Sequence, residues 1–349
     1  MEQNIKINYN GLDVGKFLCA FLILFYHYFS EHGSLPGLLD EALSLYAVAV
    51  ALFMSISGFL IFNKLNNVKN TKERWKIVKK QAIRIYSIYL LWSIPYLIFS
   101  ISNWDWQTVD IFFVLGELQR WVFQSTFYTI WFMPMLAIGL IVTFWLTEKL
   151  SPYLVNILAI ICYAIGALIL TYSFVGEKWY GFNIFAEFAN TWLGGARGWL
   201  FYAFPLILVG KHMVDYKDRM KPLPMVGASC CCILGMLAEA LLIRKISGEH
   251  TGIDLTVMML PTVFCILGFL ISIRLPDGKY AKWMRNMSTL IFMSQRLFLT
   301  VLPGCFPMIF NFAFSNLYIG AVVVTGLIFI LAILILKLSE KYLIFKRLY

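Results

Sequence analysis

Long apolar stretches, repeated along the whole chain, limit its fold more than any other feature of the sequence. A helix needs about 20 mostly apolar residues to cross the hydrocarbon core of a bilayer. Ten apolar stretches of suitable length lie at 15–30, 43–63, 82–101, 127–147, 152–173, 198–214, 223–243, 254–273, 286–311 and 317–337. The sequence therefore predicts an all-α integral membrane bundle of about ten transmembrane helices, forming a single multi-pass domain over residues 1–349.

Composition and charge support a membrane protein and orient it. Hydrophobic residues make up 60% of the chain and charged residues 14%, whereas soluble domains are about 45–50% apolar and a quarter charged. If the N-terminus is cytoplasmic, 23 of the 29 basic residues fall on the cytoplasmic side and five outside. Cytoplasmic loops of membrane proteins carry such an excess, so both termini are predicted to be cytoplasmic. No basic stretch outside the apolar runs is long enough for a nucleic-acid module.

Two outer segments, Ser102–Thr126 and Phe174–Arg197, are rich in tryptophan. Within the first, Asp110–Phe123 is apolar but short and contains charged residues, which is typical of an interfacial helix. The tryptophans fit an aromatic belt at the membrane surface. They also fit aromatic faces that stack on a sugar acceptor.

The seven cysteines give no sign of a metal site. Nearly all of them lie inside apolar runs, without histidine or aspartate neighbours at metal-ligand spacing. We therefore expect no metal, and small buried side chains at most of these positions.

Ionisable groups inside a membrane are costly and mark functional sites. His27 lies eleven residues after Lys16. At 100° per residue this spacing is about 20° from three full turns, so both side chains lie on one helix face about 16 Å apart. His27 would lie near mid-membrane, as a general base or as a structural histidine bonded to a neighbouring helix.

Other polar residues in or beside the apolar stretches are weaker candidates. Glu239 and Arg296 either pair with opposite charges or belong to a site, and Gln295 is a candidate for a substrate contact or a proton relay. Ser57 favours close helix packing and is also a candidate contact. The basic run 64–84, which includes Lys80 and Arg84, anchors the cytoplasmic face or binds a phosphorylated donor.

Several motifs together resemble the multi-pass bacterial acyltransferases of acyltransferase family three, which include O-antigen and exopolysaccharide O-acetylases. The family pattern has a Gly-Leu-Asp segment, an arginine, ten residues and a histidine, and then Ser-Gly-Phe. A basic entry to the third helix, ending Arg-Ile-x-Pro-x-Tyr, and a Leu-Trp-Phe-Leu run follow. The matching residues here are Gly11-Leu12-Asp13, Lys16, His27, Ser57-Gly58-Phe59, Arg84-Ile85-Tyr86-Ser87-Ile88-Tyr89 and Ile130-Trp131-Phe132-Met133.

The resemblance implies an O-acyltransferase in a bacterial plasma membrane. It implies transfer of an acyl group, with acetyl expected, from cytoplasmic acyl-CoA to a hydroxyl of a cell-surface or lipid-linked carbohydrate. His27 becomes the catalytic residue, as base or nucleophile, and Lys16, Lys80, Arg84 and Trp131 become donor contacts. The expected partners are membrane lipid and the glycan or lipid-linked acceptor, and homo-oligomer formation stays open.

Three positions depart from the family pattern. Lys16 replaces an arginine, Gln81 stands where many members have an arginine, and Gln295 stands in place of a late histidine. Glutamine forms hydrogen bonds but does not titrate. The alternative is a transporter of a small polar solute or lipid-linked sugar, since mid-membrane polar groups and the prolines Pro205 and Pro303 also fit a transport path.

Overall fold

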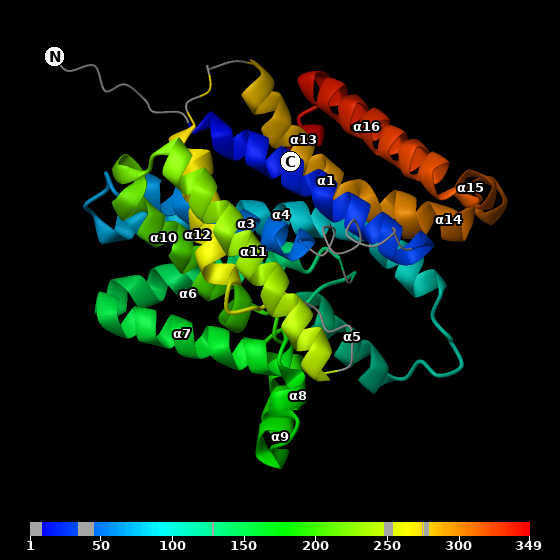
Figure 1. Ribbon diagram of the computed structural model, residues 1–349. Coiled ribbons are helices and arrows are strands. Elements are labelled where there is room, and N and C mark those ends of the chain that lie inside the picture. The colour runs from blue at the N-terminus through cyan, green and yellow to red at the C-terminus, as the bar shows by residue number, and fades with distance from the viewer. Residues whose placement is uncertain (1–8, 34–44, 128, 248–253, 274, 276–278) are drawn as a thin grey trace.

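The computed structural model describes residues 9–33, 45–127, 129–247, 254–273, 275 and 279–349. All regular elements in these ranges are helices, most of them packed into one bundle (Figure 1). Seven of the described helices are long and apolar enough to cross a membrane. They are α1 (Asn10–His32), α3 (Tyr46–Leu65), α4 (Thr71–Ser102), α6 (Phe132–Lys149), α7 (Pro152–Ile169), α11 (Pro222–Ser247) and α16 (Leu317–Lys341). The chain is therefore a multi-pass membrane protein.

The three other predicted crossings correspond to shorter or more polar helices. They are α10 (Phe204–Tyr216), α12 (Met259–Ser272) and α13 (Lys279–Arg296). Two of them adjoin π-helical turns, since η1 (Trp199–Ala203) precedes α10 and η3 (Leu297–Val301) follows α13. Residues 43 and 44 of the second predicted stretch and residue 128 of the fourth lie outside the described residues.

The predicted stretch 286–311 is not one helix. Its helix begins seven residues earlier than predicted, at Lys279, and the chain then passes through η3 into α14 (Leu302–Cys305) and α15 (Pro307–Phe314). Proline is favoured in the first turn of a helix and disfavoured in its interior. Pro303 and Pro307 accordingly lie at the starts of the two short helices, which explains the break at Phe306.

The centre of the bundle is formed by very close packing of α3 against α10. The Ser55 hydroxyl donates to the Leu206 carbonyl oxygen at 2.6 Å. A Cβ at Gly58 would overlap the backbone of Ile207, and one at Gly210 would overlap the backbone of Ser55. Only glycine permits this approach, which brings the two helix backbones into contact.

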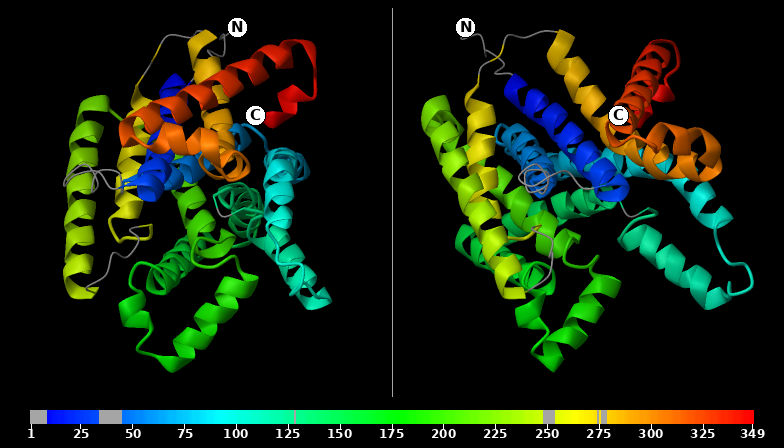
Figure 2. Two further views of the ribbon diagram at one scale, coloured as in Figure 1. Left: turned by 90° about the vertical axis from the view of Figure 1, so that its right-hand side faces the viewer. Right: turned by 45° about the vertical axis from the view of Figure 1, so that its right-hand side comes forward.

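Helices α1 and α13 run side by side and are held by ion pairs toward both ends. Near the start of α1, the Asp13 carboxylate accepts two hydrogen bonds from Arg285, at 2.8 Å and 2.6 Å. Near its end, Glu31 is bonded to Arg296. Because both pairs join early residue to early and late to late, the two helices are parallel. Figure 2 shows α16 packed along the outside of α13.

Two short helices project from the end of the bundle that lies away from the start of α1 (Figure 1). They are α5 (Ile111–Phe123) and α9 (Tyr180–Trp192), the second preceded by the single turn α8 (Ser173–Gly176). The predicted short helix at Asp110–Phe123 is thus confirmed, with Asp110 as its N-cap accepting a hydrogen bond from the Phe113 amide at 2.7 Å. None of the residues of α5 is buried.

Candidate functional site

A cavity of about 840 Å³ lies at the end of the bundle where α1 begins. Its walls come from α1, α3, α4, α6 and α13, and its volume is typical of small-molecule sites, roughly 300–1,000 Å³. Two acidic side chains line it, Asp13 and Glu73. The six basic side chains that line it are Lys16, Lys64, Lys76, Lys80, Arg84 and Arg285. We call this the basic cavity.

The basic cavity carries an excess of positive charge at its α1 wall. Arg285 is occupied by Asp13, while the Lys16 ammonium one turn along α1 is within electrostatic reach of Asp13, Arg285 and Arg84. Such a group of cations around one cavity attracts phosphate, because hydrogen bonds between cations and phosphate oxygens are among the strongest in proteins.

Three phenylalanines from different helices meet in the wall of the basic cavity. The rings of Phe53, Phe132 and Phe292 have centroids 5.5–6.1 Å apart in pairwise contact. Along α13, Arg285 and Phe292 face the cavity, and Arg296 follows one turn later. The phenylalanine cluster therefore lies between the basic cavity and the surroundings of Arg296.

Arg296 joins α13 to the far end of α1. Its side chain is 1% exposed. One guanidinium nitrogen, Nη2, lies 2.9 Å from His27 Nδ1, while Nη1 bonds Glu31 and lies 3.4 Å from the Thr300 hydroxyl. His27 and Glu31 are one turn apart on α1, so a single buried cation contacts both side chains.

The contact with Arg296 determines the protonation pattern of a neutral His27. A guanidinium has only donors, so Nδ1 of His27 must accept. In a neutral imidazole the other nitrogen then carries the proton. His27 therefore offers an N–H at Nε2, and its Nδ1 is occupied. This assignment follows from the hydrogen-bond partners.

Beside His27, aromatic rings connect α1 to a second polar group. Tyr26 stacks on Tyr46 with centroids 3.5 Å apart, and the Tyr46 ring lies 6.2 Å from the His27 ring. The charge of Arg197 acts on both His27 and Tyr46. Arg197 is bonded to Asp254 at 2.5 Å, and this carboxylate raises the pKa of Arg197 above its usual value.

Arg197 lines a second, smaller pocket of about 230 Å³. Arg120, Gln124 and Ser125, at the end of α5 and just beyond it, and Trp131, just before α6, line it as well. Gly194, with φ +81°, makes the left-handed turn after α9 that leads the chain back to Arg197. We call this the Trp131 pocket.

The two cavities meet different faces of the same segment, because Phe132 lines the basic cavity while its neighbour Trp131 lines the second pocket. Both arginines near His27 also adjoin a π-helical turn: Arg197 lies two residues before η1, and Arg296 immediately before η3. Turns of this kind occur frequently at functional sites.

Comparison with known proteins assigns the family. A sequence model described as an acyltransferase domain, that of acyltransferase family three, matches residues 9–337. This range covers nearly the whole chain. The chain belongs to this acyltransferase family.

The acyltransferase domain is also similar to curated bacterial proteins. Two Enterococcus faecalis proteins named amino-acid racemase are 25% and 24% identical to it, over 98% and 80% of this chain and 48% and 38% of their own lengths. A serine/alanine racemase of Enterococcus gallinarum is 25% identical over 74% of this chain and 36% of its own. The chain thus spans about half or less of each relative. No solved structure matches it significantly.

Of the residues predicted to contact the donor, the acyltransferase domain brings three together. Lys16, Lys80 and Arg84 line the basic cavity, as does Ser57, whose hydroxyl donates to the Phe53 carbonyl oxygen at 2.8 Å. Trp131 lies apart from them, on the second pocket.

Glu239 lies at a different place from His27. Its carboxylate accepts hydrogen bonds from the Tyr172 hydroxyl and from the backbone amides of Val257 and Met258, at 2.7 Å and 2.9 Å. Burial and this carboxylate together raise the pKa of Tyr172 above its usual value. These contacts hold the start of α12, which is a structural role.

Gln295 is 1% exposed, and neither its amide nitrogen nor its oxygen finds a hydrogen-bond partner among the described residues. The hydroxyl of the preceding Ser294 is also buried without a hydrogen-bond partner among the described residues. Buried polar groups are nearly always bonded, so this part of α13 is unusual.

Sequence reasoning missed Glu31, Arg197 and Asp254. Glu31 had a signal, because it follows His27 by four residues and so faces the same side of α1. Arg197 and Asp254 lie in separate loops, and nothing in the sequence relates one to the other.

Proposed function

We propose that this protein is a membrane-bound O-acyltransferase that moves an acyl group, with acetyl expected, from cytoplasmic acyl-CoA to a hydroxyl of a cell-surface or lipid-linked carbohydrate. The observation that carries the proposal is a basic cavity sharing helices α1 and α13 with the buried Arg296, which is bonded to His27 and Glu31. Family membership supports the reaction class.

The basic cavity is suited to the nucleotide end of acyl-CoA. That end carries a diphosphate and a separate phosphate, and it meets Lys16, Lys80 and Arg84 here. Arginine grips phosphate through a planar fork, whereas lysine acts as a point charge. Because most of the basic side chains in the cavity are lysines, we expect the affinity for the donor to depend strongly on ionic strength.

The acyl end must then reach past the phenylalanine cluster to His27. The thioester is carried on the long pantetheine arm, which is narrow and mostly uncharged, so it suits a passage lined by aromatic rings. Movement of one phenylalanine side chain, Phe292, would open the route along α13 toward Arg296.

In the transfer itself the acceptor oxygen forms a bond to the acyl carbon, the carbon–sulfur bond breaks, and the hydroxyl proton ends on the coenzyme A sulfur. His27 begins with its proton on Nε2, which suits it to donate a hydrogen bond to the thioester carbonyl oxygen as negative charge develops. For His27 to take the hydroxyl proton at Nδ1, Arg296 must first release that atom and keep only Glu31.

The topology that fits this route has ten crossings with both termini cytoplasmic. It counts α10, α12 and α13 as crossings besides the seven longer helices. The basic cavity then faces the cytoplasm, because it lies where α1 begins and is rich in lysine. The parallel direction of α1 and α13 fits their numbers as first and ninth crossings.

The test uses the purified chain in nanodiscs with radiolabelled acetyl-CoA. Release of coenzyme A and transfer of label to lipid and glycan fractions of the native host are measured for wild type, His27→Ala and His212→Ala. His212 is a matched control, bonded to Asn156 at 2.8 Å in another part of the bundle. We expect label transfer that His27→Ala abolishes and His212→Ala retains.

Absence of acetyl-CoA binding and of transfer by the wild-type protein would refute the acyltransferase proposal. Uptake of a polar solute or lipid-linked sugar into proteoliposomes, without any covalent product, would support the transporter instead.

A further inference from the structure

The Trp131 pocket is separate from the basic cavity, because Trp131 and its neighbour Phe132 line different pockets. The charge of Arg197, which lines it, acts on His27. The indole of Trp131 packs edge-on against Tyr202, with centroids 5.6 Å apart, which fixes the plane of the indole. The pocket therefore has an aromatic wall of fixed orientation and an arginine whose charge reaches His27.

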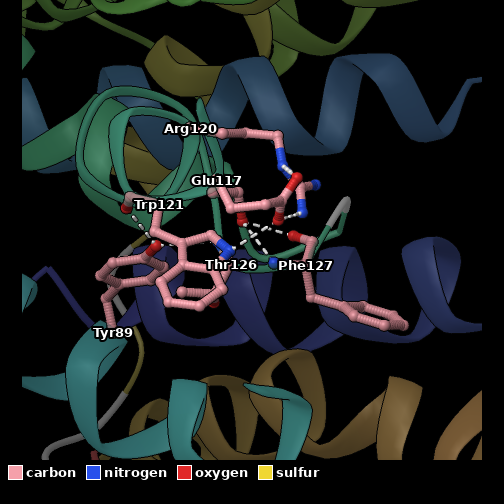
Figure 3. Close-up of polar contacts among 7 residues, drawn as sticks. Tyr89, Glu117, Arg120, Trp121, Thr126 and Phe127 are labelled. Atoms are coloured by element: carbon pink, nitrogen blue, oxygen red, sulfur yellow. Dashed lines mark hydrogen bonds and ion pairs between the residues drawn. The ribbon is translucent and has the colours of Figure 1, made fainter. Parts of the chain in front are cut away.

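The two charged side chains that line this pocket are Arg120 and Arg197, and each is paired with a carboxylate. Arg120 donates from Nε and Nη2 to Glu117, as Figure 3 shows, and Arg197 donates to Asp254. Each guanidinium thus has its own carboxylate, and each has further N–H groups. The Nε of Arg197 is buried with no partner among the described residues.

Such a balanced set fits neutral hydroxyl groups better than an anion. A hydroxyl accepts a hydrogen bond from a guanidinium N–H and donates one to a neutral oxygen, such as those of the Gln124 and Ser125 side chains that line the pocket. An added phosphate or carboxylate would instead meet two cations that are already neutralised. The flat indole of Trp131 supplies a surface for the apolar face of a sugar ring, so the chemistry is that of an uncharged sugar.

The helices beside the pocket expose apolar side chains. On α5 Phe112 is 78% exposed, and on α9 Tyr180 is 81% exposed. The side chains of Gln119 on α5 and of Gln124, which caps its end, donate to backbone oxygens of α9 at 3.0 Å and 2.7 Å, which ties the two helices together. Helices of this kind lie in the membrane interface, so the pocket between their ends would lie at the leaflet surface.

We propose that the Trp131 pocket binds the uncharged sugar of a lipid-linked glycan, with the lipid chain lying along α5 and α9. This inference rests on the proposed function for the identity of the acceptor, and it narrows that acceptor to a neutral, membrane-anchored sugar. The sugar hydroxyl then approaches His27 from the side opposite to the acyl donor.

The experiment measures equilibrium binding of a tritiated prenyl glucoside to the full chain in nanodiscs, so that it does not depend on turnover. The unlabelled competitors are methyl glucoside, prenyl glucuronide and the prenyl chain alone. Trp131→Ala is compared with Trp145→Ala, a matched control in the same segment whose side chain is exposed. Arg120→Gln is the second pocket variant.

We expect Trp131→Ala to weaken binding about tenfold, the loss of about 1.4 kcal/mol that one stacked ring provides. Trp145→Ala should bind like wild type. Methyl glucoside and prenyl glucuronide should compete poorly. Unchanged binding in both pocket variants, equal competition by methyl glucoside, or preference for the glucuronide would overturn the inference. Trp131-dependent binding without any acyl transfer would refute the proposed function and leave this site standing.

Discussion

Replacing Arg296 with glutamine tests the arrangement around His27 most directly. Glutamine keeps part of the side-chain volume and removes the charge that contacts Glu31 and His27. Truncating one partner of a buried ion pair costs roughly 3–5 kcal/mol. Because 32% of the Glu31 side chain is exposed, water replaces part of the lost contact. We therefore expect a loss near the lower limit, about 3 kcal/mol.

The reverse substitution, Glu31→Gln, should cost at least as much, because it leaves the cation of Arg296 in a site that is 1% exposed. The double variant should be more stable than the sum of the two losses predicts, with a coupling energy of about 2 kcal/mol. Thermal unfolding in detergent measures these differences, and about 3 kcal/mol corresponds to a fall in Tm of roughly 4 °C for a chain of 349 residues.

Arg285→Gln is the control for this prediction. Arg285 also pairs with a carboxylate of α1, but its side chain is 56% exposed, so we expect a smaller fall in Tm. Nitrogen-15 spectra of histidine-labelled protein give a second measure, in which wild-type His27 should carry its proton on Nε2. If Arg296→Gln had the same Tm as wild type, or if the stability losses of the two single variants simply added in the double variant, this contact would not stabilise the bundle.

Three further predictions follow from the packing and the basic cavity. Gly210→Ala forces a Cβ into the backbone of α3 and should destabilise the protein by about 1–3 kcal/mol. Gly227→Ala, with open space around it, should leave the stability unchanged or raise it by up to about 1 kcal/mol. Thermal melts of both variants check this. Lys80→Glu reverses a cavity charge and should raise KM for acetyl-CoA severalfold, with the difference shrinking at high salt; an unchanged KM at low salt would contradict the donor site. Phe292→Ala widens the phenylalanine cluster and should let longer acyl chains react, which acyl-CoA competition assays measure; unchanged chain-length preference would argue against this route.

The sequence predicted the long helices well and the interrupted ones poorly. The apolar stretch 317–337 falls within α16 because it contains no proline and its one charged residue, Lys337, lies at its end. The start of α13 was missed because its first turns, from Lys279, are polar and therefore lack an apolar signal. Its end was missed because the π-helical turn and the prolines that follow lie inside a run that stays apolar.

The candidate site also has a part that the sequence indicates and a part that it does not. Lys16, Lys80 and Arg84 come together because the starts of α1 and α4 carry their charges at one end of the bundle, which a basic sequence pattern already indicates. The contact between His27 and Arg296 joins two residues that are 269 positions apart in the sequence. It depends on which faces of α1 and α13 meet, and that is decided by the packing of the whole bundle.

Gln295 offers a last test, because stability and function should respond to it in opposite directions. Its amide is buried, and its two polar atoms find no partner among the described residues; each such group costs roughly 1–3 kcal/mol. Gln295→Leu has nearly the same volume and removes that cost, so we expect a higher Tm. The residue lies one turn beyond Phe292, on the route proposed for the pantetheine arm, whose amides can bond it. The same variant should therefore bind acetyl-CoA more weakly, and a variant that gains stability with undiminished donor affinity would show that the unpaired amide serves no substrate.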